Sequence, residues 1–284
     1  MKKILVPVDF STPSEWAVEL AAGIAEKTSA EVTLLHVVEH PTQSFNVEGE
    51  VNHDLEWEDK VYTFKLIDRS KKQLSRIEEH LRNRGIAVRT DLRVGSPYVG
   101  IKTIITQRQV DMVVMGTAGH SKLEEVLVGS ITEKVVRHAK CPVLTVHRRP
   151  ASYDFKNIVY ATSANESEKD FAQVVKDMQE IFGSNLHLVR INTPMNFKPD
   201  INVNAMMDLF AKRLHLKNYT INSFSDLSEE EGILHFASKI GADMIAMATH
   251  GRTGLAHVLA GSIAEDVVNH ASKPVLTYVT QNSH

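Results

Sequence analysis

The chain has 284 residues, of which 43% are hydrophobic and 24% charged, and a formal net charge of -3. This length suggests about two domains, and the composition allows each of them to bury a core. The small net charge gives no electrostatic footprint for nucleic acid or for an anionic membrane surface. A single cysteine, Cys141, excludes an internal disulfide. Since the chain has no apolar run of about 20 residues and no signal-peptide pattern, we expect a soluble, cytoplasmic protein.

The first half of the chain alternates predicted strands and helices. Apolar runs predict strands at 3–9, 31–38, 87–94, 112–115 and 142–146. Helical spacing and capping residues predict helices at 11–27, 61–84 and 97–108, and a further helix that begins near residue 129. The acidic stretch 39–59 shows no clear period and is predicted to be an irregular insertion, with a mobile lid over a ligand as the alternative.

Two glycines follow the strand at 112–115, and a helix begins shortly after them. The strand is apolar without alternation, as a central parallel strand requires. Gly116 and Gly119 then break the run, and Gly129-Ser130 opens the helix. Glycines let backbone N–H groups approach an anion closely, and a helix N-terminus adds unpaired donors. The unit therefore indicates a phosphate-binding loop, with a plain strand-to-helix turn as the alternative.

The spacing of these residues resembles a known signature. Gly116, Gly119, Gly129 and Ser130 form the pattern Gly-x2-Gly-x9-Gly-Ser, which resembles the ATP-binding signature of the universal stress protein family. Asp9 ends the first strand, as an Asp does in that family. The resemblance implies a sheet of strand order 3-2-1-4-5, whose switch point brings Asp9 and Gly116 side by side.

The strand and helix pattern begins again after residue 152. Strands are predicted at 157–162, 186–191, 219–224, 243–247 and 273–277, and helices at 166–182, 205–214 and 229–240. Two copies predict domains at 1–148 and 153–284, joined by a short polar linker. The expected fold class is therefore α/β, with two tandem doubly wound, parallel five-stranded sheets. By resemblance this fold is Rossmann-like, of the adenine nucleotide alpha hydrolase-like type, with the two copies packed as a pseudo-dimer through their fifth strands.

The resemblance also implies residue roles. Asp9 would hold the adenine and ribose end of ATP, although an acid at a helix N-terminus is the alternative reading of the same residue. His120 stands where the family often has an arginine. The implied nucleotide-binding set is Pro7, Val8, Asp9, Val38, Met115, Gly116, Gly119, His120, Gly129, Ser130 and Ile131.

The second copy departs from this pattern. Ser163 falls where Asp9 stands in the first copy, and Ala248 falls where Gly116 stands. The copy keeps a second candidate anion site, formed by Gly251, Arg252, Gly261 and Ser262. We therefore expect a degenerate nucleotide site that is structural or takes a different small ligand.

These observations favour a binding protein over an enzyme. The sequence shows no metal-binding set of residues, no Ser-His-Asp elbow and no positioned general base. The resemblance implies a cytoplasmic stress-response regulator that binds ATP, with Mg²⁺ as a candidate companion and a homodimer as a candidate assembly. Nucleic acid and membranes are not expected as partners. The rival hypotheses are a slow ATPase and a nucleotide-free scaffold that acts by dimerisation or partner binding.

Overall fold

The computed structural model describes residues 1–39, 53–117, 129–250 and 263–280. Its strands are β1 (Lys3–Pro7), β2 (Glu31–Val38), β3 (Val88–Val94), β4 (Met112–Gly116), β5 (Val143–Val146), β6 (Asn157–Ala161), β7 (Asn185–Asn192), β8 (Tyr219–Ser225), β9 (Met244–His250) and β10 (Val275–Thr280). Its helices are α1 (Thr12–Thr28), α2 (His53–Asn83), α3 (Pro97–Arg108), α4 (Ser130–His138), α5 (Lys169–Phe182), α6 (Asp200–Arg213), α7 (Glu229–Lys239) and α8 (Ile263–His270), with a short 3-10 helix, η1, at Glu166–Glu168.

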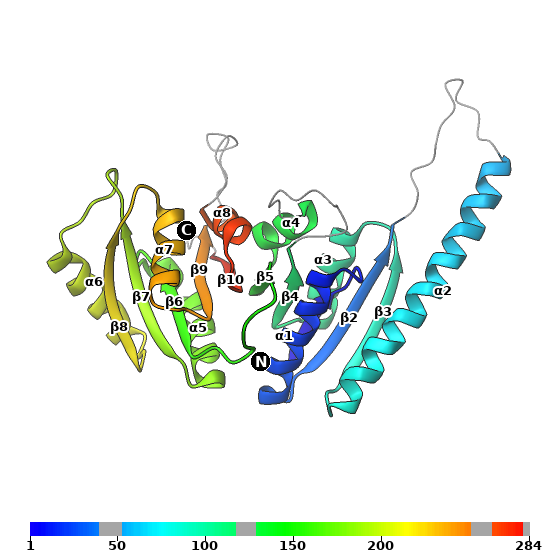
Figure 1. Ribbon diagram of the computed structural model, residues 1–284, viewed down its shortest axis with the longest axis horizontal. Coiled ribbons are helices and arrows are strands. Elements are labelled where there is room, and N and C mark those ends of the chain that lie inside the picture. Colours follow the sequence, from blue (N-terminus) through cyan, green and yellow to red (C-terminus); the bar gives the residue numbers. More distant parts are fainter. Residues whose placement is uncertain (40–52, 118–128, 251–262, 281–284) are drawn as a thin grey trace, which may run out of the picture.

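All ten strands form one sheet, in the order β3-β2-β1-β4-β5-β10-β9-β6-β7-β8. Each half has the strand order 3-2-1-4-5 that the resemblance implied, and every pairing within a half is parallel. The two halves meet where β5 pairs with β10 in antiparallel register. Figure 1 shows the two halves on either side of this junction.

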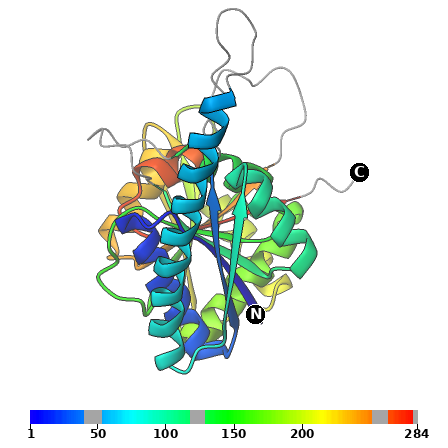
Figure 2. The same cartoon turned by 90° about the vertical axis from the view of Figure 1, so that its right-hand side faces the viewer.

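The helices cover both faces of the sheet (Figure 2), and the buried side chains divide accordingly. On one face, a single core cluster runs through both halves and includes side chains from α1, α2, α5 and α6. On the other face, α3 and α4 pack over the first half, and α7 and α8 pack separately over the second. The inter-half junction is therefore part of the main core on one face only.

Helix α2 corrects one prediction. It begins at His53, so the second part of the acidic stretch is helical rather than irregular. Its first turns lie beyond the carboxyl ends of the strands (Figure 1). Residues 40–52 of the stretch lie outside the described residues, so the alternative of a lid over 39–59 stays a prediction. None of the helices that the structure describes combines the length and apolar composition needed to cross a bilayer.

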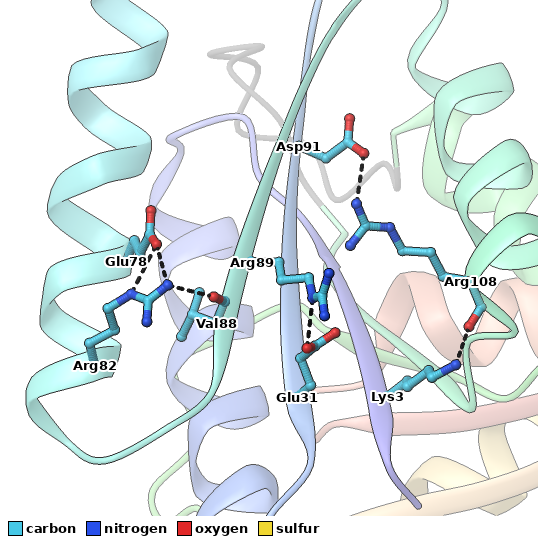
Figure 3. A network of polar contacts seen from close by, with 8 residues as sticks. All are labelled: Lys3, Glu31, Glu78, Arg82, Val88, Arg89, Asp91 and Arg108. Carbon is cyan, nitrogen blue, oxygen red and sulfur yellow. Dashed lines mark hydrogen bonds and ion pairs between the residues drawn. The ribbon is translucent and has the colours of Figure 1, made fainter.

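Charged side chains fasten the outer elements of the first half (Figure 3). Arg82 of α2 donates to Glu78 on its own helix and to the Val88 carbonyl on β3. Arg89 of β3 donates to Glu31 of β2 at 2.7 Å. These contacts tie α2 to the edge strand and the edge strand to its neighbour. Because several of them are largely exposed, we expect each to add at most about 1 kcal/mol.

Matching backbone details identify the two halves as copies of one unit. Asp111 accepts two backbone N–H bonds at the start of β1, and Asp243 accepts two at the start of β6. Phe10 and Ala164 both have a positive φ, of 63° and 58°. These φ values place Ser163 at the position that Asp9 holds in the first copy, as the sequence repeat predicted.

The junction between β5 and β10 also carries matching side-chain bonds. The Thr145 hydroxyl donates to the Val275 carbonyl at 3.2 Å, and the Thr277 hydroxyl donates to the Val143 carbonyl at 3.3 Å. Helices α4 and α8, which flank this junction, are joined by Arg137 of α4, which donates two 2.7 Å bonds to Glu265 of α8. The predicted pairing of the fifth strands is therefore observed within one chain.

An isolated first half should self-associate. Expression of residues 1–148 alone leaves β5 as an unpaired, apolar edge, because its partner β10 is absent. We expect sedimentation velocity to show a concentration-dependent dimer for this fragment. In the full chain this edge is already paired with β10, so it is not free to form such a dimer. A fragment that stays monomeric at every concentration tested would contradict the prediction.

Candidate functional site

A cleft of about 350 Å³ lies at the carboxyl ends of β1 and β4, where the strand order reverses. Such crevices are where open α/β sheets bind ligands. The residues that line it are Pro7, Val8, Asp9, Ser11, Ser14, Leu35, His36, Val37, Glu39, Pro97, Ile101, Met115, Gly116, Thr117, Gly129, Ser130, Ile131 and Thr132. The volume falls in the usual range for small-molecule sites, about 300–1,000 Å³.

Most of the implied site residues that the structure describes line this cleft. They are Pro7, Val8, Asp9, Met115, Gly116, Gly129, Ser130 and Ile131. Val38 is not among the lining residues: its side chain is buried, and its carbonyl accepts from the Gly95 N–H at 2.9 Å. The implied contact of Val38 with a ligand, through its side chain or its backbone, stays a prediction. Gly119 and His120 lie outside the described residues.

Asp9 faces the cleft and also organises the start of α1. One carboxylate oxygen accepts from the Ser11 N–H at 3.0 Å and from the Ser11 hydroxyl at 2.5 Å. Ser11 is in turn the N-cap of α1, and its hydroxyl accepts from the Ser14 N–H. Both readings of Asp9 from the sequence thus describe the same side chain: it supports a helix N-terminus and lines the cleft.

The two motif glycines that the structure describes, Gly116 and Gly129, differ in the space available for a side chain. At Gly116, a Cβ would lie 2.7 Å from the Pro13 carbonyl carbon, so β4 and the start of α1 approach too closely for a side chain. Gly116 has no positive φ, so conformational freedom is not the reason for this glycine. At Gly129, a Cβ would meet only the Thr117 carbonyl oxygen, at an ordinary 3.6 Å. The fold therefore requires Gly116 but not Gly129.

Several polar residues of the cleft were not in the predicted set, and two of them, His36 and Thr117, have informative contacts. His36 lies on β2, and its Nδ1 is 2.7 Å from the Val8 carbonyl oxygen. Because a carbonyl only accepts, Nδ1 carries the proton of the neutral ring. Burial lowers the pKa of His36, although the Val8 carbonyl and the Asp9 carboxylate oppose this. Thr117 is buried, and its hydroxyl hydrogen-bonds to Nδ1 of His147 at 2.7 Å.

The described lining of this cleft is acidic. Asp9 and Glu39 contribute carboxylates, and His36 is neutral at pH 7 because its pKa is lowered. No lysine or arginine is among the described lining residues. Across the described ranges, no three His, Cys, Asp or Glu side chains form a group that could hold a metal ion. Among the described lining groups, the donors available to an anionic ligand are the hydroxyls and the backbone N–H groups at the start of α4.

The second half has its own cleft, of about 210 Å³. Its lining residues are Ala161, Thr162, Ser163, Glu168, Val189, Arg190, Ile191, Glu229, Ile233, Met247, Ala248, Thr249, Ile263 and Ala264. The candidate anion-site residues Gly251, Arg252, Gly261 and Ser262 lie outside the described residues. Ser163 and Ala248 line this cleft, as their positions in the repeat imply.

The second cleft holds a buried carboxylate, that of Glu168, which the sequence analysis did not identify. Glu168 is 2% exposed and accepts from the hydroxyls of Tyr160, Thr162 and Ser163, and from the Ser163 N–H. Thr162 accepts from the Ala164 N–H, so its own proton is directed at Glu168. Burial, reinforced by Glu168, raises the pKa of Tyr160 well above its usual value, which keeps it a donor. The sequence offered no signal, because Glu168 reaches the cleft from η1 rather than from a strand end.

Together, the fold and the first cleft define a tandem, doubly wound α/β protein with a cleft at its switch point. The model of the universal stress protein family matches residues 1–147 and 226–278. A universal stress protein of Staphylococcus aureus (strain USA300) is 33% identical over 167 residues, which cover 58% of this chain and 95% of that protein. The chain belongs to the universal stress protein family.

Solved structures show the same architecture over the whole chain. A universal stress protein from Archaeoglobus fulgidus superposes with a TM-score of 0.75 at 19% identity, covering 99% of this chain and 97% of that one. A protein of Pseudomonas aeruginosa PAO1, described as functionally unknown, gives a TM-score of 0.70 at 18% identity, covering 99% and 93%. At these identities the likeness supports the fold alone.

Substitution of the two glycines by alanine should cost different amounts of unfolding free energy. Gly116→Ala forces its methyl group onto the Pro13 backbone, and such overpacking costs about 1–3 kcal/mol. Gly129→Ala meets no close atom and changes only an N-cap residue, so we expect a loss below about 1 kcal/mol. Urea denaturation of both variants checks this. Equal losses of unfolding free energy would show that the close approach at Gly116 is not the constraint.

Proposed function

We propose that the first cleft binds ATP and that the protein is a cytoplasmic, ATP-binding regulator of a stress response. The observation that carries this proposal is the placement of Asp9, at the end of β1, in the same cleft as Gly116 and the first turn of α4. The family resemblance had implied that juxtaposition, and the match to the family model supports the proposal.

The chemistry of the cleft suits a nucleoside at one end and phosphates at the other. The Asp9 carboxylate can accept from ribose hydroxyls or an exocyclic amine. Pro7, Val8 and Met115 offer apolar surface to a base. Gly129 leaves space beside the first turn of α4, where backbone N–H groups favour phosphate. Since the described lining is acidic, we include Mg²⁺ in the proposal as a counter-charge carried in with the phosphates.

A binding role is favoured over catalysis. Phosphoryl transfer relies on cationic groups placed at the transferring phosphate, and the described lining contains no lysine or arginine. The titratable ring in the described lining, that of His36, donates Nδ1–H to the Val8 carbonyl. The proposal therefore assigns this cleft to nucleotide sensing.

The rate of ATP hydrolysis distinguishes the proposed regulator from the alternative of a slow ATPase. We expect release of inorganic phosphate from ATP and Mg²⁺ to stay below about one turnover per minute, against about 1–1,000 per second for typical enzymes. A colourimetric phosphate assay on the purified full chain measures it, with Asp9→Asn as the control for contaminating activity. Faster release that Asp9→Asn abolishes would establish an ATPase instead.

The proposal assigns one ATP to each chain. In the second cleft, Ala248 stands at the position of Gly116 and adds a methyl group. The buried carboxylate of Glu168 also lines this cleft. The cleft is also smaller, at about 210 Å³ against about 350 Å³. Each difference disfavours a polyphosphate ligand in the second copy.

Calorimetric titration with ATP and Mg²⁺ tests the site and its stoichiometry. We expect one site per chain. Asp9→Asn keeps an oxygen for Ser11 but removes the charge, so the affinity should fall by about tenfold to a hundredfold, the value of a hydrogen bond to a charged group, roughly 1.5–3 kcal/mol.

Matched variants complete the test. Asp111→Asn makes the same change at a carboxylate that accepts from the start of β1, away from the cleft, and should leave affinity unchanged. Ser163→Ala should likewise have little effect. Two sites of equal affinity would overturn the assignment to the first cleft, and absence of saturable binding would favour the nucleotide-free scaffold.

A further inference from the structure

The second cleft holds charged side chains that have no charged partner among the described residues. Arg190, Glu168 and Glu229 all line it. None of the three forms an ion pair with another described side chain. Buried or half-buried charges are costly when they lack a counter-charge. One cation and two carboxylates around an open cleft therefore favour a ligand that brings charges of its own.

Asn196 keeps two of these charges apart. Arg190 donates from a terminal nitrogen to the Asn196 carbonyl at 3.3 Å, and the Asn196 side-chain amide donates to Glu229 at 2.5 Å. Asn196 is itself held by the Thr193 N–H, which donates to its side-chain oxygen at 2.7 Å. The guanidinium and the carboxylate are thus fixed beside one residue without pairing with each other. The Nε of Arg190 is buried and has no hydrogen-bond partner in the described structure.

The carboxylates differ in what they can still accept. Glu168 already takes four donors on its two oxygens, so its acceptor positions are filled. Glu229, which is half-buried, has one described donor, from Asn196. Glu229 is therefore the acceptor that remains for a ligand's ammonium group, and Arg190 is the donor for a ligand's carboxylate.

The rest of the cleft is apolar and small. Ile191, Ile233 and Met247 supply aliphatic wall. A volume of about 210 Å³ lies below the usual range for nucleotide-sized and drug-sized ligands, about 300–1,000 Å³. We propose that the second cleft binds a small zwitterion, a free α-amino acid with an apolar side chain, with its carboxylate on Arg190 and its ammonium on Glu229.

This site goes beyond the nucleotide function and does not depend on it. It uses no residue of the first cleft, so ATP binding and amino-acid binding are measured separately. If one of the two ligands does not bind, the proposal for the other ligand is unaffected.

Free leucine is the probe for a calorimetric or ligand-detected NMR titration of the full chain. We expect saturable binding of one leucine below about 10 mM. N-acetylleucine lacks the ammonium group and leucinamide lacks the carboxylate, so each should bind about tenfold to a hundredfold more weakly. Inorganic phosphate should not compete with leucine.

Two variants tie each charge to its group on the ligand. Glu229→Gln retains an oxygen for Asn196 but loses the charge, so it should weaken leucine binding while leaving N-acetylleucine binding as it is in the wild type. Arg190→Gln should similarly weaken leucine binding but not leucinamide binding. A merely structural role for either residue would weaken all three ligands alike.

The matched control is Glu231→Gln. It makes the same change on the same helix, outside the cleft lining, and the new side chain can still serve the cap formed with Ser228. Leucine affinity should not change. The proposal is overturned if leucine does not bind saturably, if either blocked analogue binds as tightly as leucine, if phosphate displaces leucine, or if the control variant loses binding equally.

Discussion

The antiparallel pairing of β5 with β10 is the contact on which the arrangement of the whole chain depends. Each strand would otherwise be the unpaired edge of its own half, and apolar edges promote aggregation. Their register aligns Leu144 with Leu276, both fully buried, and burial of such a side chain contributes about 1.5–3 kcal/mol. The Arg137–Glu265 bridge adds less, about 1 kcal/mol, because Arg137 is half-exposed. Burial of the two edge strands therefore contributes most of the stability of the junction. The pairing also lets one core cluster run through both halves on one face of the sheet.

The sequence predicted the sheet well because its strands are long apolar runs, and it predicted one helix start poorly. Strand β2 has the bounds expected for it, 31–38, since it is buried on both faces. Helix α2 begins at His53, in an acidic stretch without amphipathic periodicity. Periodicity arises only where one helix face packs against a core. The first turns of α2 lie beyond the strand ends, so their sequence is not constrained to show it (Figure 1).

Strand ends were the predictable part of the site. The family resemblance supplied a strand order in which β1 and β4 are neighbours, so Asp9 and Gly116, at the ends of those strands, could be placed side by side. Which side chains near a strand end line the cleft could not be predicted: Val38 is buried and is not in the lining, while His36, on the same strand, bonds the Val8 carbonyl and lines the cleft. The polar His36 among the apolar residues 34–38 was the available signal.

The second cleft shows why position-by-position comparison of the copies is misleading. Taken alone, the change from Asp9 to Ser163 removes a carboxylate. The repeat, however, also matches Ser14 with Glu168 and Val6 with Tyr160, and in the structure all three replacements meet, since Tyr160 and Ser163 both donate to Glu168. A buried carboxylate without such donors would be strongly disfavoured. The other two replacements therefore stabilise the Glu168 carboxylate, and together the three form a buried polar centre in the second cleft.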